Sequence, residues 1–167
     1  MLKHFLINNK IFWVGTLLAV TLAIGCSAIT HRSNTKTHTM KKKILFVVTS
    51  HDTKGSTGEK TGYYLGEVSH PWEVLTEAGY EIDFVSPKGG NPPVDGFDLS
   101  DPVNKKFWED AVYQKKITYS MRPSEVKTED YAAIYYAGGH GAMWDLPTND
   151  ALNKIAATIY EKDGIVA

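Results

Sequence analysis

The hydrophobic positions of this chain form short runs separated by polar, glycine-rich segments. The run at 44–49 (ILFVVT) is continuous and rich in β-branched residues, as expected for a parallel strand buried on both faces. Segments 81–87 (EIDFVSP) and 132–137 (AAIYYA) predict two further strands, and 165–167 begins a fourth. The strand signals are therefore spread along the chain rather than gathered in one region.

Helical periodicity fills the intervals between these strands. Apolar or aromatic residues recur at helical spacing over 63–78, where Pro71 is expected to break or kink the helix. A Gly-, Pro- and Asp-rich excursion over 88–102 ends in a short predicted helix around 103–112. Segment 149–162 predicts another amphipathic helix.

The alternation of strands and helices predicts an α/β fold with a doubly wound parallel sheet. Parallel strands joined by right-handed crossovers place helices on both faces of the sheet. Chemistry in such folds gathers beyond the carboxyl ends of the strands. The last predicted strand stops at Ala167 with no helix after it, so we expect the C-terminal part of the fold to be missing from this chain.

The first forty residues have a different pattern. Residues 11–25 (IFWVGTLLAVTLAIG) are uncharged and too short for a permanent membrane span, which predicts a signal peptide over 1–25. Residues 22–26 (LAIGC) resemble a bacterial lipobox, in which Cys26 would become the lipidated N-terminus. The lipidated end and a polar, Ser- and Thr-rich tether would then occupy 26–40.

This leader predicts an exported lipoprotein anchored to a bacterial membrane through Cys26. Two alternatives remain open, namely an uncleaved anchor and a plain signal peptide cut near 27–28, which would give a periplasmic or secreted protein. The run at 40–43 also looks like an internal translation start, which would give a cytosolic form. The folded domain is expected over 41–167.

Composition and charge narrow the function classes. Hydrophobic residues make up 43% of the chain and charged residues 22%, as in ordinary globular proteins, and Cys26 has no second cysteine to pair with. Residues 1–51 carry seven Lys or Arg and no acidic residue, whereas 52–167 carry eleven against nineteen acidic residues. An acidic body disfavours nucleic acid as a partner.

Four motifs follow one another in a fixed order: 42–50 (KKILFVVTS), 58–67 (GEKTGYYLGE), 84–90 (FVSPKGG) and 137–146 (AGGHGAMWDL). Together they resemble the ThiJ/PfpI family, and most of all its glyoxalase III and Hsp31-type chaperone branch. The resemblance implies a flavodoxin-like sandwich and a homodimer in the complete protein. It also implies a nucleophilic cysteine in a Cys-His-Gly sequence after the strand at 164–167, where this chain ends.

The resemblance assigns roles to residues that would support that nucleophile. Glu67 matches a glutamate beside the cysteine, where a carboxyl group can tune a thiolate and shuttle protons. Gly138 and Gly139 match a turn whose N–H groups help to form an oxyanion hole. His140 is a candidate acid or base, and equally a hydrogen-bonded structural residue.

Other polar residues near this turn have weaker claims. Trp144 and Asp145 are expected to line the mouth of the site or to brace the turn. Glu67 and His70 have the i, i+3 spacing of a shared metal on a helix. Because the sequence offers no third ligand nearby, we predict no metal site, and the resemblance implies an enzyme without a cofactor.

The resemblance implies an enzyme that converts methylglyoxal or a related 2-oxoaldehyde into a 2-hydroxy acid, or an activity of the protein deglycase type. The alternative from another class is a holdase chaperone for unfolded proteins, in which an aromatic-rich excursion would bind the client. A non-catalytic lipoprotein remnant and a cysteine peptidase or amidotransferase are further alternatives. Without the nucleophile, the chain as given is not expected to be active. The aromatic residues of the excursion are Phe97, Phe107, Trp108 and Tyr113.

Overall fold

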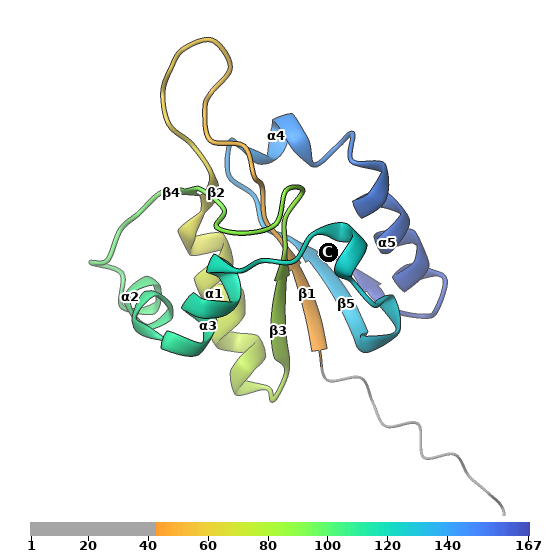
Figure 1. The fold of residues 1–167 in the computed structure, drawn as a ribbon. Coiled ribbons are helices and arrows are strands. Elements are labelled where there is room, and N and C mark those ends of the chain that lie inside the picture. The colour runs from red at the N-terminus through yellow and green to blue at the C-terminus, as the bar shows by residue number, and fades with distance from the viewer. Residues whose placement is uncertain (1–42) are drawn as a thin grey trace, which may run out of the picture. The chain divides into compact units, whose positions relative to one another are not determined.

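The computed structural model describes residues 43–167 and shows an α/β fold built on one parallel sheet (Figure 1). Each neighbouring pair of strands in this sheet is parallel. The predicted α/β architecture is therefore confirmed over the described residues. The strands, in spatial order, are β3 (Glu81–Val85), β1 (Lys43–Val47), β5 (Tyr131–Tyr136) and β6 (Ile165–Val166).

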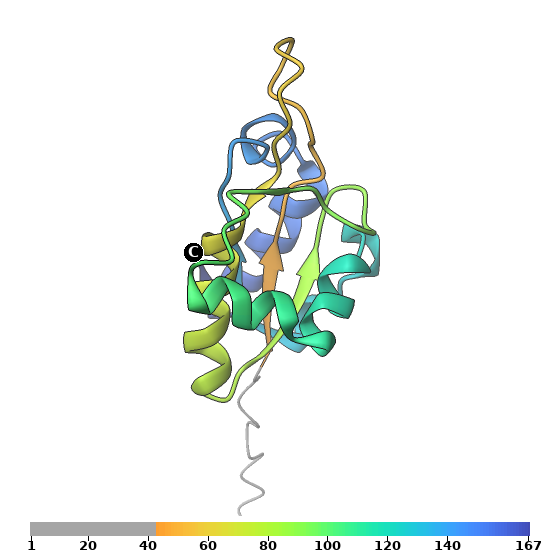
Figure 2. The same ribbon diagram turned by 90° about the vertical axis from the view of Figure 1, so that its left-hand side faces the viewer.

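Helices cover both faces of the sheet, as the alternation of elements predicts (Figure 1). The helices are α1 (Leu65–Glu77), α2 (Pro102–Glu109), α3 (Ala111–Thr118), α4 (Ala142–Asp145) and α5 (Asp150–Tyr160), with 3-10 turns η1 (Pro123–Glu125) and η2 (Thr128–Asp130). Helices α1, α2 and α3 contribute to the hydrophobic cluster on one face of the sheet, and α5 contributes to the cluster on the other. Figure 2 looks onto the side of α1, α2 and α3, with α5 behind the strands.

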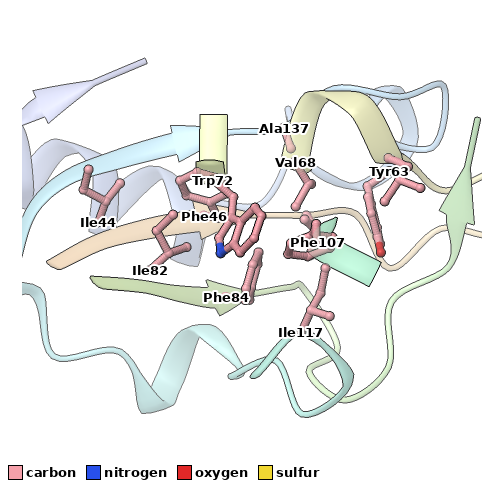
Figure 3. Packing of buried hydrophobic residues seen from close by; sticks show 12 residues of the cluster. Ile44, Phe46, Tyr63, Val68, Trp72, Ile82, Phe84, Phe107, Ile117 and Ala137 are labelled. Atoms are coloured by element: carbon pink, nitrogen blue, oxygen red, sulfur yellow. The ribbon is translucent and has the colours of Figure 1, made fainter. Parts of the chain in front are cut away.

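Two hydrophobic clusters fill the spaces between the sheet and its helices. Figure 3 shows the cluster under α1, in which Phe46 and Phe84 of the sheet face Trp72 and Phe107 of the helices. The ring centroids of Trp72 and Phe107 are 5.3 Å apart in an edge-on arrangement, which aromatic pairs favour. The cluster on the α5 side consists of Leu45, Val47, Val85, Tyr131, Ile134, Leu146, Leu152, Ile155 and Ile159.

The structure corrects two helix predictions. The expected break at Pro71 does not occur, because α1 runs through Pro71 without interruption. The single helix expected around 103–112 is two helices, since Asp101 caps α2 and Asp110 caps α3. Each aspartate accepts hydrogen bonds from the N–H groups two and three residues ahead, at 2.8–3.0 Å, which is how N-cap residues start helices.

Two short strands were not predicted. β2 (Tyr63–Tyr64) pairs in parallel with β4 (Val94–Asp95) as a separate two-stranded sheet. This pair ties the start of α1 to the excursion that follows β3. It also fixes the backbone next to the glycine turn described below.

A cluster of charged residues lies where side chains of β1, β3 and α3 meet. The Asp83 carboxylate accepts hydrogen bonds from Lys116 Nζ at 2.8 Å, from Lys43 Nζ at 3.1 Å and from Tyr131 Oη at 3.1 Å. Burial alone would raise the pKa of Asp83, but the two lysines outweigh it and hold that pKa below its ordinary value. The carboxylate is therefore ionised and paired in the folded protein.

The predicted signal peptide, the lipidation site Cys26 and the tether lie outside the described residues. Within residues 43–167, none of the helices has the length and apolar character needed to span a bilayer.

Candidate active site

The residues singled out by the glycine and glutamate motifs meet at the carboxyl end of the sheet. The first turn of α1 carries Glu67, and the segment after β5 forms the turn at 138–141. A cavity of about 280 Å³ lies between them, lined by Tyr64, Glu67, Gly139, His140 and Met143. This is the end of a parallel sheet at which α/β proteins hold ligands.

Glu67 and Gly138 are in direct contact. The Gly138 N–H donates a hydrogen bond of 2.7 Å to Oε2 of Glu67. A Cβ atom at position 138 would lie 2.3 Å from that oxygen, so only glycine allows the approach. The Gly138 N–H, for which the resemblance implies an oxyanion-hole role, thus orients the Glu67 carboxylate in this structure.

Gly139 occupies a conformation that other residues rarely adopt. Its φ is +117°, and a Cβ atom there would lie 2.4 Å from the Gly62 carbonyl oxygen. The turn is docked on β2 by a hydrogen bond of 2.9 Å from the Tyr64 N–H to the Gly138 carbonyl. Within residues 43–167 the Gly139 N–H forms no hydrogen bond.

His140 lies at the mouth of the cavity rather than against Glu67. Its side chain is 64% exposed, and Nδ1 is 3.7 Å from Oδ2 of Asp95. Burial would raise the pKa of Asp95, but hydrogen bonds from Thr61 and from the Gly96 N–H outweigh it and lower that pKa.

Asp145 braces the turn, which is one of the two roles expected for it. Its Oδ1 accepts from Thr49 Oγ1 at 2.6 Å, and its Oδ2 accepts from the Ser50 N–H at 2.8 Å. These bonds tie α4 to the end of β1. The neighbouring Trp144 stacks on His51, with ring centroids 4.9 Å apart and planes within 9°.

The described residues do not assemble a metal centre. Glu67 and His70 do not form the metal pair suggested by their spacing. His70 Nε2 instead lies 3.0 Å from Oδ2 of Asp101. Nowhere in residues 43–167 do three His, Cys, Asp or Glu side chains come together as metal ligands.

The aromatic surface expected of a chaperone is small. Phe107 is fully buried, and Trp108 and Tyr113 pack against the core cluster. Phe97 is 51% exposed, but its ring packs edge-on against Trp108 with centroids 4.7 Å apart. The excursion therefore uses its aromatic residues mainly for packing.

Sequence reasoning missed one residue that contacts Glu67. The Tyr135 hydroxyl donates a hydrogen bond of 3.0 Å to the main-chain carbonyl of Glu67. Pro71, four residues after Glu67, signals only that the Glu67 carbonyl lacks its helical donor, and not that Tyr135 supplies another.

Comparisons with known proteins identify homologues and similar folds. The glutathione-independent glyoxalase HSP31 of Saccharomyces cerevisiae is 34% identical over 136 residues, which are 75% of this chain and 56% of the relative. The crystal structure of glyoxalase III from Candida albicans matches with a TM-score of 0.67 and 29% identity over 76% of this chain and 56% of that one. The 24 kDa rapid encystment protein of Francisella tularensis matches with a TM-score of 0.70 and 38% identity over 75% and 56% of the two chains. No family model matches the chain.

The flavodoxin-like fold and these homologues are those of the ThiJ/PfpI (DJ-1) superfamily, to which this chain belongs. Within that superfamily its homologues are the Hsp31 and glyoxalase III proteins. The resemblance stated from the four motifs is confirmed. The chain spans 56% of the length of the curated relatives first matched.

Proposed function

We propose that the full-length protein converts methylglyoxal, or a closely related 2-oxoaldehyde, into the corresponding 2-hydroxy acid without glutathione. The observation that carries this proposal is the Glu67 carboxylate, fixed by the Gly138 N–H at the wall of a cavity of about 280 Å³. The relatives named as glutathione-independent glyoxalases support the same reaction.

The nucleophile in this proposal is the cysteine that the family resemblance places after the strand matching β6. Its thiolate attacks the aldehyde carbon, and the new C–S bond gives a hemithioacetal. A proton then moves from the former aldehyde carbon to the neighbouring ketone carbon, which leaves a thioester of the 2-hydroxy acid. Water cleaves the thioester and returns the thiol. One carbon is oxidised as its neighbour is reduced, so one water molecule balances the reaction.

Glu67 is the group that carries the proton between the two carbons. Its Oε2 is held by the Gly138 N–H, which leaves Oε1 to accept and return the proton. Glu67 also lies in the first turn of α1, where the partial positive charge of the helix N-terminus stabilises a carboxylate. The Gly139 N–H supports the developing oxyanion at the other side of the cavity.

The test replaces Glu67 by Gln in the full-length protein and follows lactate formation from methylglyoxal without glutathione. Loss of the proton carrier should reduce kcat by about 100-fold or more. Glu77→Gln is the matched control, because Glu77 is an exposed glutamate at the far end of the same helix. Lactate formation that survives Glu67→Gln rejects the proposed role.

The same variant separates catalysis from the chaperone alternative. If the protein acts only as a holdase, the unmodified protein does not turn over methylglyoxal. Glu67→Gln then suppresses the aggregation of client proteins as well as the unmodified protein does. Phe107 is buried, and the half-buried Trp108 and Tyr113 pack against the core cluster, which disfavours that outcome.

We also propose that the protein is exported and anchored through a lipid on Cys26. The basis is the lipobox-like segment 22–26 and the single cysteine at its end. Mass spectrometry of the N-terminal peptide from the native source should show an acylated Cys26, and Cys26→Ser should release the protein from the membrane fraction. An unmodified chain that retains residues 1–25 argues against the proposal.

A further inference from the structure

Pro71 leaves one main-chain carbonyl of α1 without its usual partner. In an α-helix, the N–H of each residue donates to the carbonyl four residues earlier. Pro71 has no N–H, and the carbonyl that would have received it belongs to Glu67. Glu67, the residue proposed to carry the proton, therefore also has a main-chain carbonyl that receives no helical hydrogen bond from residue 71.

A side chain from the sheet supplies the missing donor. The Tyr135 hydroxyl donates to the Glu67 carbonyl oxygen at 3.0 Å. The Tyr135 ring lies against Phe46, with centroids 4.8 Å apart, and the two residues are register partners of β5 and β1. Because the ring is packed on the central strand, the hydroxyl is held at a fixed place relative to the sheet.

The Tyr135 hydroxyl is a dependable donor. Its burial, and then the charge of Glu67, raise the pKa of Tyr135 above its ordinary value. The hydroxyl therefore keeps its proton at neutral pH.

Glu67 is thus attached to one strand at two points. Tyr135, near the end of β5, holds its main-chain carbonyl, and Gly138, just after β5, holds its carboxylate at 2.7 Å. Two attachments to the same rigid element restrict both the start of α1 and the direction of the side chain. Such restriction matters in catalysis, because a misplacement of about 1 Å can cost about 100-fold in rate.

We propose that Tyr135 is a positioning residue for Glu67, and that Pro71 creates the vacant carbonyl through which it acts. This inference rests on the proposed function, in which Glu67 moves the proton. It assigns Tyr135 no contact with the substrate. Its effect is therefore on the proton-transfer step and not on substrate binding.

The first test is Tyr135→Phe in the full-length protein. Loss of the hydroxyl should lower kcat for methylglyoxal by about tenfold, with KM changed less than about twofold. Tyr136→Phe is the matched control, because Tyr136 is the next residue of β5 and its hydroxyl donates to the Leu152 carbonyl on the α5 side, at 3.4 Å. That variant should keep its kcat.

The second test restores the helical donor. Pro71→Ala supplies an N–H four residues after Glu67, which can bond the same carbonyl. The double variant Tyr135→Phe/Pro71→Ala should therefore recover the kcat of Pro71→Ala alone. Circular dichroism confirms that each variant is folded, so recovery reports on the position of Glu67 rather than on general stability.

The outcomes separate this inference from the proposed function. If Glu67→Gln is inactive while Tyr135→Phe keeps full kcat, the positioning role is overturned and the proposed function stands. A loss in Tyr135→Phe that Pro71→Ala fails to restore also overturns it, because the hydroxyl then acts elsewhere. Full turnover in Glu67→Gln overturns both.

Discussion

The Gly138 N–H donates a hydrogen bond of 2.7 Å to the Glu67 carboxylate across 71 positions of sequence. The contact joins the first turn of α1 to the glycine turn after β5, which are the two places where the motif resemblance locates the site. It requires that position 138 carry no side chain. Gly138 is therefore needed to position the Glu67 carboxylate as well as to form the turn.

Gly138→Ala should displace the Glu67 carboxylate, because the new Cβ would lie 2.3 Å from Oε2. We expect kcat for aldehyde turnover to fall by about 100-fold. In the Glu67→Gln background the same substitution should have little further effect, since both changes act through one group. Steady-state kinetics on the four proteins of this double-mutant cycle measure the coupling, and additive losses would contradict it.

Gly139→Ala should destabilise the fold more than Gly58→Ala does. Both glycines have positive φ, at +117° and +76°, so each alanine carries a conformational cost of about 1–2 kcal/mol. Only at position 139 would the Cβ also meet backbone, 2.4 Å from the Gly62 carbonyl oxygen, whereas nothing lies within 4 Å at position 58. Urea unfolding of both variants measures the difference, and equal destabilisation would show that the Gly139 turn relaxes freely.

Asp145→Ala should loosen the loop at 51–62, which projects beyond the carboxyl end of β1 (Figure 1). The substitution removes the bonds of 2.6 and 2.8 Å to Thr49 and Ser50 and leaves the stack of Trp144 on His51 without its neighbouring brace. Hydrogen exchange of amides in the loop should become faster. Asp150→Ala, at the first residue of α5, is the control. If hydrogen exchange in the loop is unchanged, the stacking of Trp144 on His51 alone holds the loop in place.

The sheet was readable from the sequence because its main strands are short runs rich in apolar and aromatic residues. The signal is strongest in β1, whose residues 44–47 are all buried, and weaker in β3 and β5, where buried positions are mixed with half-buried or exposed ones. β2 and β4 have two residues each, too few for any periodicity, and their pairing depends on a contact about thirty residues apart. The split between α2 and α3 was readable in principle, since Asp101 and Asp110 are both N-cap residues.

The site was partly readable for a similar reason. Glu67 and the two glycines belong to motifs that keep their order and spacing, and the structure brings them together. The Tyr135 contact could not be read from spacing, because it depends on how α1 packs over β5. Pro71 indicated only that a helical hydrogen bond would be lost, not which side chain would replace it.

Asp83→Asn should destabilise the protein by about 2 kcal/mol at neutral pH, because it removes the charge that pairs with Lys43 and Lys116. The pKa of Asp83 is lower in the folded state than in the unfolded chain. Its contribution is therefore present above the unfolded value of about 3.9 and is lost as pH falls through the folded value.

The difference in unfolding free energy between the unmodified protein and Asp83→Asn should thus be largest near neutral pH and shrink below about pH 4. Glu129→Gln, an exposed carboxylate in η2, is the control for a general change in net charge. Urea unfolding at a series of pH values measures both variants. A difference that stays constant down to pH 2 would mean that Asp83 stabilises the fold through its hydrogen bonds and not through its charge.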